Sequence, residues 1–217
     1  HDRELAHRVI MAADASIPVN KREEYLGSPR LPSSWKLRLE RLGAALEAGA
    51  QQPTQQSFEL AEQRMRELTR HRWADGKEQV RTLEQAEMAL RLLAWLVVRT
   101  DKQRNTHGRQ AWSESEALAS WYAQEGGRID LARRRARGAG AGQFGIGVEA
   151  VLARVDTIRD ELDHRFAKGL PDWLEAKRPT RRLLPIHQAA EVFGAEFLTS
   201  GPLGSKRRLL VLLIDGM

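Results

Sequence analysis

The chain has 217 residues, a formal net charge of +6 and a pI near 10.0, and it contains no cysteine. The absence of cysteine excludes disulfides, thiolate-bound zinc, iron–sulfur clusters and cysteine nucleophiles from this sequence. The longest strongly apolar run, residues 209–214, is far shorter than the ~20 residues of a membrane span, so we expect a cytoplasmic protein without membrane contacts.

Three windows carry apolar residues every three or four positions, which is the spacing of amphipathic helices. The stripes are Trp35, Leu39, Leu42 and Leu46; then Leu83, Ala86, Leu90, Leu93 and Val97; then Val151, Val155, Ile158, Leu162 and Phe166. We expect these three helices to build the core. Further helical windows cover residues 4–13, 58–71 and 114–124, and Pro18, residues 27–32 and residues 52–54 mark breaks between helices.

The composition changes twice in the second half of the chain. Residues 138–147 are rich in glycine, and residues 177–182 form a basic cluster that Pro179 interrupts. We place a domain boundary at the second change, with a helical region over residues 1–178 and a second part over residues 179–217. The second part is expected to contain a short linker helix and a buried β-strand at residues 209–214, after which the chain stops. The predicted fold is therefore a mainly α multi-helix bundle with one C-terminal strand, and we expect the chain to be a piece of a larger enzyme.

Gly140, Gly142 and Gly145 fit the G-x-G-x-x-G pattern, in which glycines let a backbone turn approach a pyrophosphate. That pattern requires a preceding strand, whereas residues 130–137 are Arg-rich and helical in character. We therefore interpret the segment as a flexible connection between two helices.

Two Glu-x-x-His pairs, Glu4/His7 and Glu161/His164, have the spacing of ligands in di-iron carboxylate bundles. At ~100° per residue, both pairs lie away from the apolar stripes of their helices, so we predict that they face solvent. A stand-alone di-iron enzyme is kept as a competing hypothesis that metal analysis would test.

Six tryptophans accompany the arginines and could in principle form a base-stacking platform. Most of them recur near the apolar stripes or at helix ends. We predict that they serve as core and rim packing residues instead.

The densest positive charge comprises Arg128, Arg133, Arg134, Arg135 and Arg137. Arg133 and Arg137 lie one turn apart on one helix face, where they could hold a phosphate or an acidic partner surface. The alternative is a solvated helix end whose cations complement the helix dipole. Nucleic acid, bound through Arg133, Arg134 and Arg137, is therefore one candidate partner, and both interpretations stay open.

Asp215 follows the expected strand at its carboxyl end, where α/β sheets place ligands, and Gly216 lets the chain turn sharply after it. Asp-Gly pairs are also common in ordinary turns. From its position alone, Asp215 could be either a metal-binding carboxylate or an ordinary turn residue.

The segment 207–217, Arg-Arg-Leu-Leu-Val-Leu-Leu-Ile-Asp-Gly-Met, resembles the first strand of the PglZ domain, an alkaline-phosphatase-like domain of BREX phage-defence systems. Residues 121–133, 174–179 and 184–189 look like the helical region that precedes this domain in type 2 systems.

The resemblance implies that residues 179–217 open an α/β phosphatase-like domain and that Asp215 binds a catalytic divalent metal, usually zinc. It also implies that the nucleophile and the remaining metal ligands belong to residues after Met217. One carboxylate cannot assemble a zinc site, so this sequence alone is expected to bind no cofactor and to have no phosphatase activity. Its expected role is an interaction scaffold for other phage-defence proteins, and the alternative is an Arg-rich helical nucleic-acid-binding module.

Overall fold

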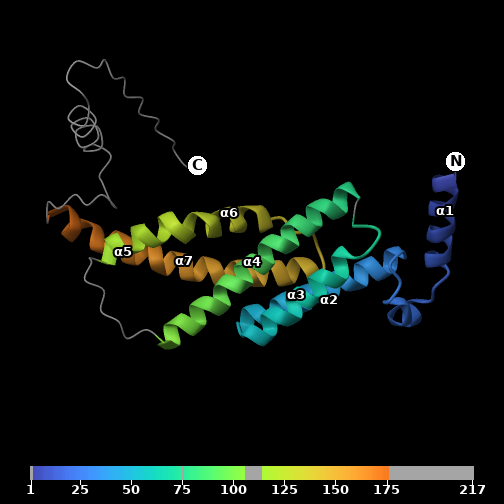
Figure 1. The fold of residues 1–217 in the computed structure, drawn as a ribbon, viewed down its shortest axis with the longest axis horizontal. Helices are drawn as coiled ribbons and strands as arrows, with labels where there is room; N and C mark the ends of the chain where they lie inside the picture. The colour runs from blue at the N-terminus through green and yellow to red at the C-terminus, as the bar shows by residue number, and fades with distance from the viewer. Residues whose placement is uncertain (1, 75, 106–113, 176–217) are drawn as a thin grey trace, which may run out of the picture. The chain divides into compact units, whose positions relative to one another are not determined.

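A computed structural model of the chain describes residues 2–74, 76–105 and 114–175, with side chains for residues 4–74, 76–100 and 115–175 (Figure 1). The fold is mainly α, as predicted, and no strand occurs in the part of the chain that the structure describes. The expected strand at residues 209–214 and the expected boundary between residues 178 and 179 lie outside it.

The helices divide between two compact units. In chain order they are α1 (Asp2–Ala15), the 3₁₀ helix η1 (Val19–Tyr25), α2 (Pro32–Gln51), α3 (Gln55–Thr69), α4 (Lys77–Asn105), α5 (Glu114–Trp121), the π-helix η2 (Tyr122–Gly126), α6 (Gly127–Ala136) and α7 (Gln143–Glu175). Residues 1–110 and 124–163 form the first unit, and residues 111–123 and 164–217 form the second. Helix α7 therefore contributes residues to both units.

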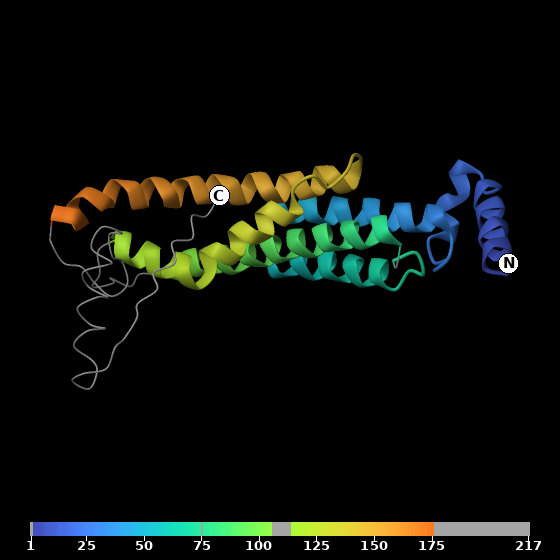
Figure 2. The same cartoon turned by 90° about the horizontal axis from the view of Figure 1, so that it is seen from above.

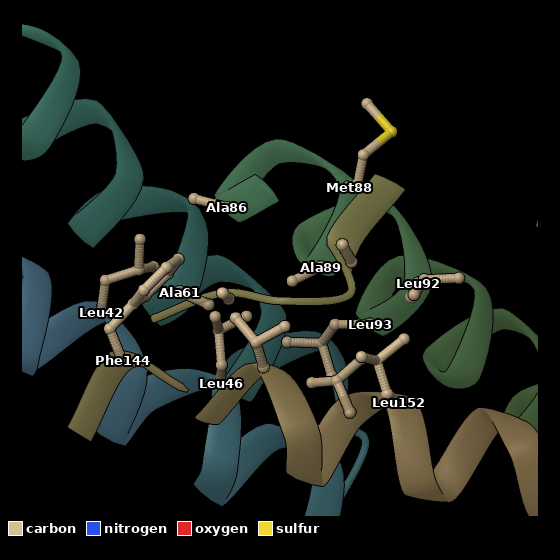
Figure 3. Close-up of a cluster of buried hydrophobic side chains, with 14 of the residues drawn as sticks. Leu42, Leu46, Ala61, Ala86, Met88, Ala89, Leu92, Leu93, Phe144 and Leu152 are labelled. Atoms are coloured by element: carbon tan, nitrogen blue, oxygen red, sulfur yellow. The ribbon is translucent and has the colours of Figure 1, made fainter. Parts of the chain in front are cut away.

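The first unit is built around α2, α3, α4, α6 and the first part of α7 (Figures 1 and 2). The three predicted stripes lie on α2, α4 and α7, and most of their residues enter or pack against one buried cluster, which confirms that these helices contribute to the core. Val97, Leu162 and Phe166 lie outside this cluster. Leu42 and Leu46 of α2, Leu93 of α4 and Val151 of α7 are completely buried. Figure 3 shows side chains from α2, α3, α4 and α7 meeting in this cluster.

Helix starts follow local signals in the sequence. Pro32 occupies the first turn of α2, where its missing N–H removes no hydrogen bond. Thr54 caps α3: its Oγ1 accepts from the Ser57 N–H at 3.1 Å, and the Ser57 Oγ accepts from the Thr54 N–H at 3.0 Å. The predicted break at residues 52–54 is confirmed.

The glycine-rich segment has two structural roles, of which only one was predicted. Gly138 and Gly142 have φ of 74° and 88° in the connection between α6 and α7, a region that glycine enters without strain. Gly147 instead lies inside α7, against Gly43 of α2. A Cβ at Gly147 would lie 2.7 Å from the Gly43 carbonyl carbon, so this crossing depends on the missing side chain.

The described part of the second unit contains α5 and the last turns of α7. The Ser115 Oγ donates to the Phe166 carbonyl at 3.3 Å, and the Trp173 Nε1 donates to the Glu116 Oε1 at 3.4 Å. A Cβ at Gly169 would lie 2.5 Å from the Ser115 Oγ. Small and polar residues thus set the close approach of these two helices.

Candidate anion-binding cleft between α4 and α6

An ionic network joins α6 to α7 in the first unit. The Arg133 Nη1 donates to the Asp130 Oδ1 at 2.7 Å, and its Nε donates to the Asp156 Oδ1 at 2.6 Å. The Arg159 Nε donates to the same Asp130 oxygen at 3.2 Å. The Arg159 side chain is only 7% exposed, so its charge relies on these carboxylates rather than on water.

Arg133 is fixed by this network. Burial lowers the pKa of its guanidinium, but the hydrogen bonds to Asp130 and Asp156 outweigh burial, so the pKa is raised above its usual value. The side chain is 20% exposed. Arg133 therefore stays charged and is already paired within its own chain.

A cleft of about 620 Å³ lies beside this network, between α4 and the C-terminal end of α6. Helix α4 provides Arg81, Glu84, Gln85, Glu87, Met88 and Arg91, and the end of α6 provides Arg134, Arg135 and Arg137. The Gln85 Nε2 donates to the Arg137 carbonyl at 3.2 Å and ties the two walls together. Ala86 and Ala89 of α4 and Ala132 and Ala136 of α6 are buried in the core below. Such small side chains let two helices pack closely.

The five arginines of the cleft differ in their partners. Arg91 pairs with Glu87 at 2.5 Å, and Arg137 pairs with Asp156 at 3.0 Å. No carboxylate among the side chains that the structure describes forms an ion pair with Arg81, Arg134 or Arg135, and all three are exposed. Opposed cations on two walls of a cleft focus a positive potential between them.

The sequence prediction for the arginine cluster is refined by this geometry. Arg133 and Arg137 do lie on one face of the helix end, but both contact Asp156 there. Arg134 and Arg135, at the next positions, line the cleft instead. The sequence reasoning missed Arg81 and Arg91 of α4, although Arg81, Glu84, Met88 and Arg91 step by three or four residues and therefore share a helix face.

His71, at the end of α3, is a second buried titratable group. Its Nδ1 accepts from the Trp73 N–H at 3.2 Å, and its ring packs edge-on against Trp35 with centroids 5.7 Å apart. Burial lowers its pKa, and the nearby charge of Arg38 lowers it further. His71 therefore loses its proton more readily in the folded chain than in the unfolded chain.

The described residues considered for metal binding do not form a centre. Glu4, His7, Glu161 and His164 are all exposed, as predicted. Within the described ranges, no group of three or more His, Asp or Glu side chains is placed to hold a metal ion. Asp215, the predicted metal ligand, lies outside the described residues.

The tryptophans whose side chains are described are packed or partly packed. Trp35 and Trp173 are buried, and Trp73, Trp95 and Trp121 are half-buried. The Arg99 guanidinium lies 5.5 Å from the centre of the Trp95 ring. These positions agree with the predicted packing role, and Trp112 lies outside the described residues.

No known protein family, curated protein or solved structure matches this chain. The likeness of residues 121–133 and 207–217 to PglZ proteins therefore stays a prediction from the sequence. A search of the described helices for one long and apolar enough to cross a membrane finds none.

Proposed function

We propose that this chain is the helical interaction region of a PglZ-like metal-dependent phosphatase or phosphodiesterase of a BREX phage-defence system, and that the cleft between α4 and α6 is its binding face. The cleft supports the binding role, because Arg81, Arg134 and Arg135 are exposed cations that form no ion pair with a described carboxylate. The sequence likeness supports the family. Asp215 would supply one ligand of a divalent metal, and zinc is the first candidate.

The expected partner of this face is anionic. Guanidinium groups donate hydrogen bonds in a fixed planar fork that matches carboxylates and phosphates. The buried network behind the cleft holds Arg137 in place through Asp156, and Gln85 fixes the backbone of the same residue. A scaffold of this kind brings a charged partner to a catalytic domain without itself taking part in the chemistry.

The binding role is tested with two matched triple variants. The cleft variant carries Arg81→Gln, Arg134→Gln and Arg135→Gln, and the control carries Lys36→Gln, Arg72→Gln and Arg154→Gln. The three control residues are also exposed, and they do not line the cleft. Since both variants lose three positive charges, only the position of the charges differs. The cleft variant should elute from a heparin column at lower salt than the control, and equal elution would contradict the proposed face.

The catalytic part of the proposal requires a chain that continues past Met217. Such a protein should hydrolyse bis-p-nitrophenyl phosphate when loaded with zinc and should lose activity in a metal chelator. Asp215→Ala should lower turnover by orders of magnitude, since a metal ligand is removed. Full activity in that variant would show that the metal assignment is wrong.

A further inference from the structure

We infer that the cleft between α4 and α6 receives the phosphodiester backbone of a nucleic-acid duplex. The inference rests on the proposed binding face and names its partner. It follows from three properties of the lining residues: their polarity, the absence of aromatic rings among them, and the spacing of the cations along α4.

The lining is more polar and more positively charged than the centre of a typical protein–protein interface. Met88 is the one apolar residue among those that form the walls, and it is 6% exposed, so it adds little accessible apolar surface. Protein interfaces place aromatic or aliphatic anchors in a desolvated centre. Nucleic-acid interfaces are more polar and more positively charged, as this cleft is.

The lining also lacks the groups that bind single strands. Proteins that bind single-stranded nucleic acid stack the bases on aromatic side chains, at roughly 1–3 kcal/mol per base. None of the residues that line the cleft is aromatic. The cleft therefore offers contacts to a backbone but no platform for unpaired bases, which favours a duplex.

Two arginines lie along the α4 wall, Arg81 without a described ion pair and Arg91 paired with Glu87, and a second wall lies opposite. Arg81 and Arg91 are ten positions apart on α4, which corresponds to ~15 Å along the helix axis. A duplex carries one phosphate charge per ~1.7 Å of its axis, so a row of this length meets several phosphates. Arg134 and Arg135 lie on the opposite wall, where they would contact the same backbone from the side.

Because the cleft lies at the C-terminal end of α6, the helix dipole does not help to bind phosphate there. Helix C-termini carry a partial negative charge and expose carbonyl groups, which do not attract phosphate. Arg134 and Arg135 must therefore supply the attraction through their guanidinium groups. Two carboxylates on the α4 wall, Glu84 and Glu87, further limit the affinity. We expect weak, strongly salt-dependent binding without sequence preference.

The test uses fluorescence anisotropy with labelled probes of similar total charge: a DNA duplex of about 20 base pairs, the matching RNA duplex, and a DNA single strand and a poly-glutamate peptide that are each about twice that length. Binding is measured between about 50 and about 200 mM salt. The wild-type chain and the two triple variants are compared, with circular dichroism and thermal melting to show that all three are folded.

The inference predicts that a duplex binds more tightly than the single strand and the peptide. The cleft variant should lose roughly tenfold or more in affinity for the duplex, and the slope of log affinity against log salt should fall by about 2–3, while the control stays closer to wild type. The DNA and RNA arms decide which duplex is preferred.

Two results would overturn the inference while leaving the proposed face intact: tighter binding of the single strand, or poly-glutamate binding that equals duplex binding and is lost in the cleft variant. Absence of binding to every probe at about 50 mM salt would overturn both the inference and the anionic face itself. Equal binding of the duplex to the cleft variant and to wild type would also overturn the inference, since the duplex would then bind outside the cleft.

Discussion

Helix α7 is held to its neighbours in two different ways within the first unit. Against α2 the two backbones meet at Gly147 and Gly43, and against α6 the helix is joined by ion pairs of Asp156 and Arg159. The glycine contact depends on shape alone, so one added methyl group is enough to disturb it. The ionic contact tolerates small changes in shape but requires that every charge keep its partner.

The same difference appears on α6 between consecutive arginines. Arg133 is paired with the carboxylates of Asp130 and Asp156. Arg134 and Arg135 line the cleft and form no described ion pair. One segment of sequence thus contributes to internal structure and to a surface available for binding. Substitutions at the two kinds of residue should therefore separate internal structure from binding.

Gly147→Ala should be the most destabilising substitution. The new Cβ would lie 2.7 Å and 2.8 Å from the Gly43 carbonyl carbon and Cα. Because backbone atoms cannot rotate away, α2 and α7 would have to move apart and leave gaps among the buried side chains. We expect a loss of about 3 kcal/mol or more in the free energy of unfolding, measured by urea denaturation.

Gly140→Ala is the matched control in the same glycine-rich segment. A Cβ at Gly140 meets nothing within 4 Å, and its φ is not in the left-handed region. Its stability should stay within about 0.5 kcal/mol of wild type. Similar losses in both variants would show that the segment is sensitive throughout and that the α2–α7 contact is not the cause.

Asp130→Ala should come next, since it removes a partner of both Arg133 and Arg159. The Arg159 side chain is 7% exposed, and the other carboxylate with which it forms a described ion pair, Asp163, is 63% exposed. A fully buried pair costs about 3–5 kcal/mol when one partner is removed; Asp130 is 29% exposed, so we expect about 2 kcal/mol.

Asp163→Ala provides the comparison for that result. It also removes a carboxylate partner of Arg159, at 3.1 Å, but this carboxylate is 63% exposed, whereas that of Asp130 is 29% exposed. Its cost should be at most about 1 kcal/mol and should shrink in high salt. If Asp163→Ala matched Asp130→Ala, the buried position of Asp130 would not explain its importance.

His71, whose ring packs against Trp35, should make the stability of the chain depend on pH. Burial and the charge of Arg38 lower its folded-state pKa below the unfolded value of 6.5. Since the unfolded chain binds the proton more readily, stability is complete above about pH 6.5 and falls as the pH drops below it towards the folded pKa. Urea denaturation between about pH 8 and about pH 5 measures this slope.

His71→Gln should flatten that part of the pH profile, although the variant is itself less stable because it disturbs packing against Trp35. His164→Gln, at an exposed position, should keep the wild-type slope. If His71→Gln kept the full slope, the loss of stability on acidification would have to originate at another group.

The apolar stripes made the main helices predictable, because burial at Leu42, Leu93 and Val151 requires apolar residues at helical spacing. The α2–α7 crossing was not predictable, since a glycine at position 147 looks the same in a flexible linker as in a tight helix contact. The arginine cluster was visible in the sequence, but which of its arginines form ion pairs within the chain was not. Pairing depends on Asp156, which lies 23 residues after Arg133 in the chain and reaches it only through the fold.

Arg134→Gln should have the smallest effect on stability. Its contrast with Arg133→Gln most directly distinguishes a residue that is ion-paired within the fold from one that lines the cleft. Arg133→Gln breaks hydrogen bonds to Asp130 and Asp156, so we expect a loss of about 1–2 kcal/mol. Arg134→Gln removes no described ion pair and should change the free energy of unfolding by less than about 0.5 kcal/mol. Duplex binding should be weakened more by Arg134→Gln than by Arg133→Gln, because Arg134 lines the cleft and Arg133 does not. If Arg133→Gln weakened duplex binding more than Arg134→Gln while both variants remained folded, the binding surface would include the ionic network and its assignment to the cleft would be wrong.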